Sequence, residues 1–571
     1  MMSAQAGRVK AGTSSLKATC VDCVPPTTNL GGGTTCDRCL RGYVNLETNG
    51  TAHCVRCPRG FLCAAGSTPG NVTLRRGFWR GSYDLEATRC RGGAKRCVGG
   101  HGAGDALCHG GSTGPACDVC LPGHAPNRRN RCRACESNGG VIIVVMLALG
   151  LGTLLYLGGR LSRSTLADDA RARSRLRLAF KLRAKWRILF VAAQLLALQR
   201  IEGVRYPGMY RRLPFDVVAL DVPALLAPLA CRLGLRVGFY ARLRVATLGP
   251  VVVVGSYAVL RGTWRSSKLA PVHAFALLVS FCVFLVVSVT VLSSFGCDKI
   301  GSDAFLRADY GITCGSSSHT WNTVYALACV LVYPLGVPLS YIYVLWRDRA
   351  GLDPIIDGKR ARTRERMEAA QIERVANTKL RRSSMLWGPY EPEHYLWEAW
   401  ECLRRLLTGG LAPLLFPFRP LLQITASLAV ALASLKLYVT YKPFAVAADD
   451  RLAELLCWLL VLTQLAVLVH EASQRRDARE VGWALLALLV GAFTTGLYLI
   501  FVDVRREREA LADLVTHSKR KMGRRLSSLR SLSARRSSAL DEEVGPKSPR
   551  RREAPSFVQV KLCPPPSPGL P

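Results

Sequence analysis

Residues 141–157 read V-I-I-V-V-M-L-A-L-G-L-G-T-L-L-Y-L and contain no charged side chain. An apolar run of this length can cross the hydrocarbon core of a bilayer as an α-helix. The segment 160–187 that follows is rich in Arg and Lys, and its only acidic residues are Asp168 and Asp169. Because basic loops stay on the cytosolic side of a membrane, this pattern predicts a cytosolic loop and an N-terminus outside the cell.

Further apolar runs predict an all-α polytopic membrane bundle of about nine transmembrane helices. The predicted spans are 141–157, 188–205, 243–260, 269–295, 321–346, 396–416, 420–441, 452–470 and 481–502. Nine crossings that begin outside end inside, which suits the basic C-terminal tail. The segment 215–230 carries two Asp and two Pro, so we interpret it as interfacial or re-entrant. A tenth span there would place the tail outside.

The chain therefore divides into four predicted parts. These are a disordered N-terminus at 1–19, a cysteine-rich extracellular domain at 20–139, a transmembrane domain at 140–503, and a disordered basic cytosolic tail at 504–571. Residues 1–19 hold no apolar h-region, so we expect either that the first span acts as a signal-anchor or that a signal peptide precedes residue 1. The expected location is the plasma membrane.

The cysteine-rich domain has too few apolar residues for a conventional core, so crosslinks would have to replace one. The chain has 22 cysteines. The candidate disulfide cysteines of this domain are Cys20, Cys23, Cys36, Cys39, Cys54, Cys57, Cys63, Cys90, Cys97, Cys108, Cys117, Cys120, Cys132 and Cys135. Their connectivity cannot be read from the sequence.

Cys-x-x-Cys pairs in the same domain are also compatible with zinc. Two glycosylation sequons, at Asn49 and Asn71, and the adjoining membrane span favour an oxidising compartment and hence disulfides. Cys297 and Cys314 lie in a loop that the nine-span topology also places outside. We expect these two cysteines to form a further disulfide.

Charges within predicted spans are rare and therefore informative. The sixth span carries Glu398, Glu401, Arg404 and Arg405, and only residues 406–416 separate the Arg pair from Pro417. Those residues are too few to cross a bilayer, so the charges must enter its cytosolic half. Glu401 and Arg405 share a helix face at i,i+4. The four residues either line a cation pathway or gate, or form an ion pair that locks the span against its neighbours. Lys436, Tyr438, Tyr441 and Lys442 are interpreted as interfacial anchors.

The net charge of +37 is compatible with nucleic acid, but the basic blocks flank apolar spans, which indicates a membrane protein instead. The expected partners are the lipid bilayer, anionic lipids at the basic loops and tail, and an extracellular ligand or protein, with no nucleic acid. The sequence leaves a homo-oligomer open. Arg precedes Ser384, Ser527, Ser533 and Ser538 in patterns that basophilic kinases recognise, which makes these serines candidate phosphorylation sites. Signatures of enzymes are missing, so we expect neither catalysis nor a cofactor.

Two regions resemble known families. The order of cysteine, glycine and aromatic motifs over residues 20–135, including Gly77-Phe78-Trp79-Arg80 and Thr113-Gly114-Pro115-Ala116-Cys117, resembles ephrin-receptor-like and EGF-like repeats. Residues 140–505 resemble TRP-like membrane proteins of fungi, oomycetes and microalgae through Trp186-Arg187-Ile188-Leu189-Phe190, Leu306-Arg307-Ala308-Asp309-Tyr310, Tyr390–Gly409 and Tyr441-Lys442-Pro443-Phe444.

The TRP-like resemblance implies an ion channel or sensor with a ligand-binding or partner-binding ectodomain. The alternative is a non-conducting receptor or adhesion scaffold. The interval between the last two predicted spans, residues 471–480, is too short for a pore helix and filter, so conduction would need another route.

Overall fold

The computed structural model describes part of the 571-residue chain. The described residues are 8–11, 19–29, 35–47, 52–126, 132–135, 170–198, 231, 238–260, 269–356, 358–360, 362–416, 419–473, 483–506 and 509. Residues 1–505 form one unit and residues 506–571 form another. The predicted first span 141–157, the ambiguous segment 215–230 and nearly all of the predicted tail lie outside the described residues.

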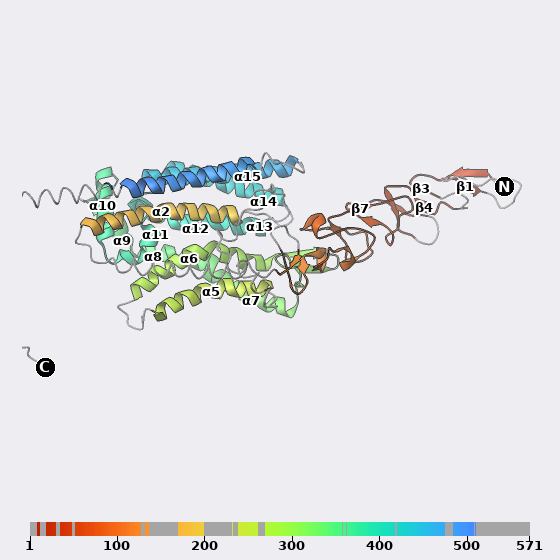
Figure 1. The fold of residues 1–571 in the computed structure, drawn as a ribbon, viewed down its shortest axis with the longest axis horizontal. Coiled ribbons are helices and arrows are strands. Elements are labelled where there is room, and N and C mark those ends of the chain that lie inside the picture. The colour runs from red at the N-terminus through yellow and green to blue at the C-terminus, as the bar shows by residue number, and fades with distance from the viewer. Residues whose placement is uncertain are drawn as a thin grey trace, which may run out of the picture. The chain divides into compact units, whose positions relative to one another are not determined.

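The N-terminal region consists of short antiparallel strand pairs joined by glycine turns, with little regular structure besides (Figure 1). The strands of this region are β1 (Arg8–Ala11), β2 (Thr19–Asp22), β3 (Thr27–Thr28), β4 (Arg38–Cys39), β5 (Tyr43–Asn45), β6 (Cys54–Arg56), β7 (Phe61–Leu62), β8 (Thr73–Leu74), β9 (Phe78–Trp79), β10 (Thr88–Arg89), β11 (Ser112–Thr113), β12 (Val119–Cys120), β13 (His124–Pro126) and β14 (Cys132–Ala134). They pair as β1–β2, β3–β4, β5–β6, β7–β8, β9–β10, β11–β12 and β13–β14. Three 3₁₀ turns accompany them, η1 (Gly93–Lys95), η2 (Gly104–Leu107) and η3 (Pro115–Cys117).

Disulfides hold this region together in sequence order. They join Cys23–Cys36, Cys39–Cys54, Cys57–Cys63, Cys90–Cys97, Cys108–Cys117 and Cys120–Cys132. Each bond closes a short loop, so the region is a chain of small crosslinked modules with one buried apolar cluster around Phe61, Leu74, Trp79 and Leu107. The side chain of Cys20 lies outside the described residues.

The C-terminal two-thirds of the described chain is helical (Figure 1). The helices are α2 (Ala170–Leu198), α5 (Phe239–Leu260), α6 (Leu269–Leu292), η6 (Ser293–Phe295), α7 (Ser317–Val330), the π-helix η7 (Leu331–Gly336), α8 (Val337–Arg347), α9 (Arg349–Leu352), α10 (Arg364–Ala376), η8 (Leu380–Ser383), α11 (Ser384–Trp387), η9 (Pro392–His394), α12 (Trp397–Leu406), the π-helix η10 (Leu407–Leu411), α13 (Ala412–Leu415), α14 (Pro420–Tyr441), α15 (Ala447–Ser473) and a final helix at Trp483–Arg506. Two hairpins complete the region, β15 (Cys297–Ile300) with β16 (Asp303–Leu306), and β17 (Ile355–Ile356) with β18 (Lys359–Arg360).

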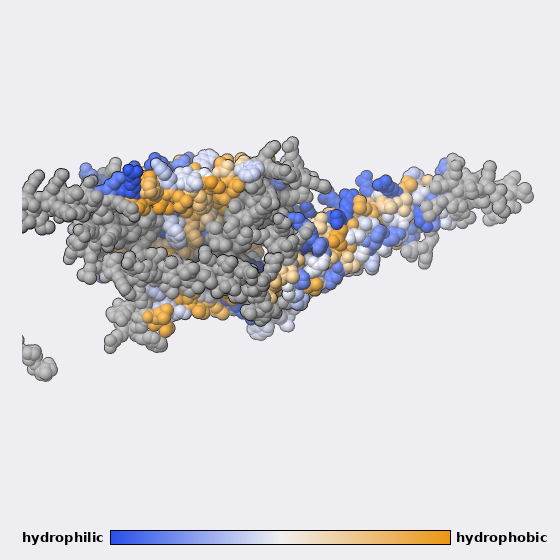
Figure 2. All heavy atoms as spheres, in the orientation of Figure 1, coloured by the Kyte–Doolittle hydropathy of each residue, from blue (hydrophilic) through white to orange (hydrophobic). Residues whose placement is uncertain are grey.

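Six of the described helices are long and apolar enough to cross a membrane. They are Phe239–Leu260, Pro271–Phe295, Ser317–Arg347, Leu421–Tyr441, Ala447–His470 and Trp483–Arg506. The chain is thus a multi-pass membrane protein by the length and composition of these helices. Figure 2 shows hydrophobic residues on the outer face of the helices, and more hydrophilic residues over the strands of the N-terminal region. Lipid would cover such an apolar face in a bilayer.

The structure supports six spans rather than the nine predicted. The predicted span 141–157 lies outside the described residues, as do the last residues of 188–205. Residues 188–198 belong to α2, which starts at Ala170 within the predicted cytosolic loop. The predicted span 396–416 is broken into α12, η10 and α13, and its charges and short apolar stretch keep it from qualifying.

The bundle core lies between α2, α6, α15 and the final helix. Leu195, Leu285, Leu456 and Leu485 are all buried there in one cluster. α14 lies against α15, and α5 lies against α6 (Figure 1). α12 contacts both α6 and α8, and η10 contacts α6 and α14. The packing therefore places the charged face of α12 inside the bundle.

Candidate functional site

The charged residues of α12 are buried in the bundle, where they form the charge cluster, defined as Arg187, Glu398, Glu401, Arg404 and Arg405. None of the five residues is more than 5% exposed. The last four come from α12, whose polar face points toward α2, α6 and α14, and Arg187 comes from α2. Burying isolated charges costs several kcal/mol each, so such residues persist only when they are paired.

Glu401 is the most heavily bonded member of the charge cluster. It accepts two hydrogen bonds from Arg404, at 3.0 Å from Nε and 2.5 Å from Nη2. The hydroxyl of Tyr438 on α14 donates to the same carboxylate at 2.8 Å. The i,i+4 contact with Arg405 that the sequence predicted is present at 3.5 Å, but it is looser than the i,i+3 contact with Arg404.

Glu398 is held mainly from outside its own helix. Arg187 of α2 pairs with its Oε2 atom, and the hydroxyl of Tyr390 donates to the same atom at 2.9 Å. Arg405 lies 3.7 Å from Oε1, beyond hydrogen-bond range. Within the described residues, Oε1 of Glu398 and Nη2 of Arg405 have no hydrogen-bond partner. The cluster thus combines tight pairs with one loose contact.

Aromatic faces complete the enclosure of the charge cluster. The guanidinium groups of Arg187 and Arg405 lie 4.7 and 4.4 Å from the ring centroid of Phe281 on α6. A cavity of about 30 Å³ adjoins the cluster, and Tyr390, Tyr438, Cys457 and the charged residues other than Glu398 line it. This volume suits roughly two water molecules. Three cations against two anions, around so small a space, make a poor path for a cation.

A second buried node, the Lys185 triad, was missed by the sequence analysis. Nζ of Lys185 lies 2.5 Å from Asp449 on α15 and 2.6 Å from Asp503 on the final helix. Lys185 and Asp449 are at most 1% exposed. In the sequence, Lys185 is one of many basic residues in a predicted loop. Its position within α2, which begins at Ala170, is the one signal that could have indicated burial.

The Cys297–Cys314 disulfide closes a loop between α6 and α7, named here the 297–314 hairpin. Its Asp298 accepts hydrogen bonds from Nε of Arg307 at 2.8 Å and from the hydroxyl of Tyr310 at 2.7 Å. Arg91 of the N-terminal region also reaches Asp298, at 3.1 Å. Burial raises the pKa of the Tyr310 phenol, which keeps it a neutral donor to Asp298.

The hairpin and the N-terminal region share an apolar contact as well. Ile300 and Tyr310 belong to the same buried cluster as Leu107 and Cys117. The Arg91 guanidinium lies 4.1 Å from the ring centroid of Tyr310 and donates to the carbonyl of Arg307.

The hairpin is also tied to the bundle. Asp309 Oδ2 accepts from the backbone N–H of Phe239 at 3.1 Å, at the start of α5. A carboxylate at a helix N-terminus satisfies a free N–H group and complements the helix dipole. Arg307, Asp309 and Tyr310 all lie in the quoted Leu306–Tyr310 motif, so its polar residues serve the hairpin's contacts.

Other predicted sites are placed as follows. Cys135 pairs with Cys231, a partner that the sequence analysis did not name. Cys282, Cys329, Cys402 and Cys457 are free and buried. Tyr438 is buried against Glu401, so its interpretation as an interfacial anchor is wrong, whereas Lys436, Tyr441 and Lys442 are exposed.

The candidate modification sites fall on different kinds of surface. Asn71 is exposed, while Asn49 lies outside the described residues. Ser384 is half-buried at the start of α11, where a kinase would have poor access. Ser527, Ser533 and Ser538 lie outside the described residues.

Fold and site define a multi-pass membrane protein with a disulfide-rich N-terminal region and charges buried among its helices. Comparison with protein-family models, with curated proteins and with solved structures finds no match to this chain.

Proposed function

We propose that the chain is a membrane sensor of the TRP-like type, in which the N-terminal region binds a ligand or partner and the helical bundle responds. The observation that carries this proposal is the contact of Arg91 with Asp298 and Tyr310. It joins the disulfide-rich region to a loop of the bundle through an ion pair, a cation–π contact and shared apolar burial. A flexible tether would transmit little, whereas a packed interface moves as a unit.

The path from this contact leads directly to helix ends. The 297–314 hairpin continues α6 and precedes α7, and its Asp309 holds the first N–H group of α5. Farther along, the hydroxyl of Tyr333 in η7 donates to the carbonyl of Thr247 in α5. A displacement of residues 90–119 by a ligand would therefore be felt by three neighbouring helices.

The charge cluster is the element of the bundle best suited to two arrangements. Arg405 lies 3.5 Å from Glu401 and 3.7 Å from Glu398, so it is shared loosely between two carboxylates. The π-helix η10 follows directly after α12, and π-bulges are frequent at functional sites. A change in the side-chain torsions of Arg405 would exchange one pairing for the other, and a small rotation of α12 would break the contacts that Arg187 and Tyr438 make from other helices.

The proposed setting follows from the charge pattern of the sequence. The N-terminal region would lie outside the cell and the basic tail inside, at the plasma membrane. Anionic lipids would contact the basic cytosolic segments. Protease added to intact cells should cleave an epitope tag at residue 20 and spare one at the C-terminus.

The direct test of the sensor is Arg91→Ala, compared with Arg89→Ala as a control. Arg89 is the last residue of β10, two residues before Arg91, and it is exposed. In purified full-length protein, Arg91→Ala should raise hydrogen exchange across residues 297–314 and at the start of α5, and Arg89→Ala should not. Equal exchange in both variants would exclude transmission through this contact.

A second candidate function is ion conduction through the bundle, which the buried charges and the π-helix η10 favour. The Arg excess and the small cavity oppose a cation path in this arrangement. Planar-bilayer recordings of the wild-type protein, and of Glu398→Gln with Glu401→Gln, separate the two. A current altered by the substitutions supports conduction, and its absence in wild type supports a non-conducting receptor.

A further inference from the structure

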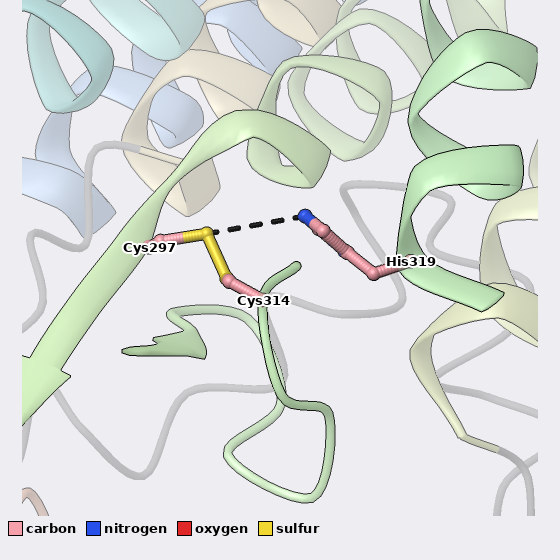
Figure 3. A group of neighbouring side chains, drawn as sticks. All are labelled: Cys297, Cys314 and His319. Atoms are coloured by element: carbon pink, nitrogen blue, oxygen red, sulfur yellow. Dashed lines mark hydrogen bonds between the residues drawn. A yellow bond between two sulfur atoms is a disulfide. The ribbon is translucent and has the colours of Figure 1, made fainter. Parts of the chain in front are cut away.

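The Cys297–Cys314 disulfide lies beside a histidine, as Figure 3 shows. Nε2 of His319, in the first turn of α7, is 3.9 Å from Sγ of Cys297. The other ring nitrogen, Nδ1, lies 2.8 Å from the hydroxyl of Tyr240 on α5. Tyr240 thus fixes the ring so that Nε2 faces the sulfur. Cys297, Cys314 and His319 are each half-buried as residues, so a small reagent can approach.

Three other disulfide sulfurs of the described chain have oxygen atoms as polar neighbours. Sγ of Cys54 and Sγ of Cys97 face the carbonyls of Arg38 and Ala116, at 3.9 and 3.4 Å. Sγ of Cys108 faces the Asp105 carboxylate at 4.0 Å. An imidazole N–H stabilises a departing thiolate, whereas a carboxylate or carbonyl oxygen opposes it. Of these four sulfurs, that of Cys297 therefore has the environment that favours bond cleavage.

We propose that Cys297–Cys314 is a thiol-exchange site, at which an external dithiol opens the disulfide with His319 assisting the departure of Cys297. The attacking thiolate forms a bond to Sγ of Cys314, the Cys297–Cys314 bond breaks, and Cys297 leaves as a thiolate beside His319. The second thiol of the reductant then attacks the mixed disulfide and releases Cys314. The dithiol becomes a cyclic disulfide, the protein gains two electrons, and two protons end on the cysteines.

Opening this bond has a consequence that rests on the proposed sensor function. The hairpin between the two cysteines carries Asp298 and Tyr310, which hold Arg91. Without the crosslink the hairpin gains conformational freedom, and the Arg91 contact must then order it at an entropic cost. Thiol exchange would therefore loosen the N-terminal region from the bundle.

The chemistry is tested by mass spectrometry of the full-length protein after timed exposure to dithiothreitol and alkylation. Cys297 and Cys314 should be alkylated about tenfold faster than Cys108 and Cys117, because leaving-group stability controls exchange rates. Equal rates, or faster opening of Cys108–Cys117, would overturn the assignment.

The position of the first glutathione adduct separates a chemical role of His319 from a purely structural one. With the monothiol glutathione, the first adduct should form on Cys314, since Cys297 is the better leaving group. His319→Ala should slow opening about tenfold and distribute the adduct over both cysteines. The exposed Ser317→Ala serves as the control and should change neither. An adduct on Cys297 in the wild type, or an unchanged preference in His319→Ala, refutes the mechanism.

The coupling is tested separately by hydrogen exchange of residues 90–119 before and after selective opening. Greater exchange, matching that of Arg91→Ala, supports control of the contact by the thiol site. If the disulfide opens as described and hydrogen exchange of residues 90–119 stays constant, opening does not control the Arg91 contact. The thiol-exchange mechanism is then still supported. If Arg91→Ala itself has no effect, the sensor function fails first.

Discussion

The N-terminal region and the helical bundle both bury arginines, and Arg80 and Arg404 show two different ways of satisfying them. Arg80 is fully buried in the N-terminal region and donates to the backbone carbonyls of Pro69, Gly102 and His101 at 2.8 to 3.0 Å. In the bundle, Arg404 and Arg405 are held by carboxylates. Backbone carbonyls are free in a loop-dominated region, whereas helices consume theirs internally. A helix that buries Arg404 therefore offers it another acceptor, the carboxylate of Glu401.

This contrast predicts where each region is vulnerable. The N-terminal region depends on covalent bonds that shape loops, and its buried Arg80 donates to backbone carbonyls. The bundle depends on matched charges, so removal of one member leaves others unbalanced. Substitutions of equal size should therefore have unequal effects in the two regions.

The largest effect is expected for Glu401→Ala. It leaves Arg404 without its carboxylate, Arg405 with Glu398 alone and Tyr438 without its acceptor, and the loss of one partner of a buried pair costs about 3–5 kcal/mol. Thermal unfolding in detergent, followed by the fraction of monodisperse protein, measures this loss. Glu373→Ala, at an exposed position of α10, is the control and should change little. A loss below about 1 kcal/mol would mean that the charges are solvated.

The second effect is the removal of a crosslink by a Cys39→Ser and Cys54→Ser double substitution. The bond closes a loop with a sequence separation of 15, and loss of such a closure costs about 3 kcal/mol. The damage should stay within the N-terminal region, so limited proteolysis should cut near residues 39–54 while unfolding of the bundle is unchanged. Simultaneous loss of both regions would show that they fold as one unit.

A smaller effect is expected for Arg80→Met. Three carbonyls lose their donor, but no opposite charge is stranded, and the apolar stem still fills the site. The cost should be about 1–3 kcal/mol, below that of Glu401→Ala. Hydrogen exchange of residues 69–102 is the measurement. A loss larger than that of Glu401→Ala would reverse the contrast between the regions.

The sequence predicts the features of each region that depend on a short stretch of the chain. Cysteine density and helix-length apolar runs depend on composition over short windows, and both the disulfide-rich region and the six candidate spans follow from them. Glu398 and Arg405 were expected to enter the cytosolic half of the bilayer because too few apolar residues follow them, and the structure buries both within the bundle. Partners contributed by distant elements were not predictable. Arg187, Tyr390 and Tyr438 reach the cluster from other segments, and periodicity does not say which helices pack together.

The same limit explains the errors. Tyr438 was assigned to the membrane interface because it lies near the end of an apolar run beside Lys436 and Tyr441. Tertiary packing turned its hydroxyl toward Glu401 instead. Cys231 had no cysteine neighbours in sequence, so nothing local suggested its bond to Cys135.

The smallest effect should be found at Gly409, in η10 beside the charge cluster. An added Cβ would lie 2.9 Å from Cδ1 of Leu285 on α6, so Gly409→Ala forces Leu285 to move, at about 1 kcal/mol. Gly255→Ala is the matched control, because a Cβ there meets no atom within 4 Å. Alanine is the better helix former by about 1 kcal/mol, so this control should leave stability equal or raised. The two variants make the same chemical change, so opposite signs in thermal unfolding would show that α12 and η10 are held against α6 by close packing as well as by charge. If both variants gain stability, Leu285 yields freely, and ion pairs alone position this helix in the bundle.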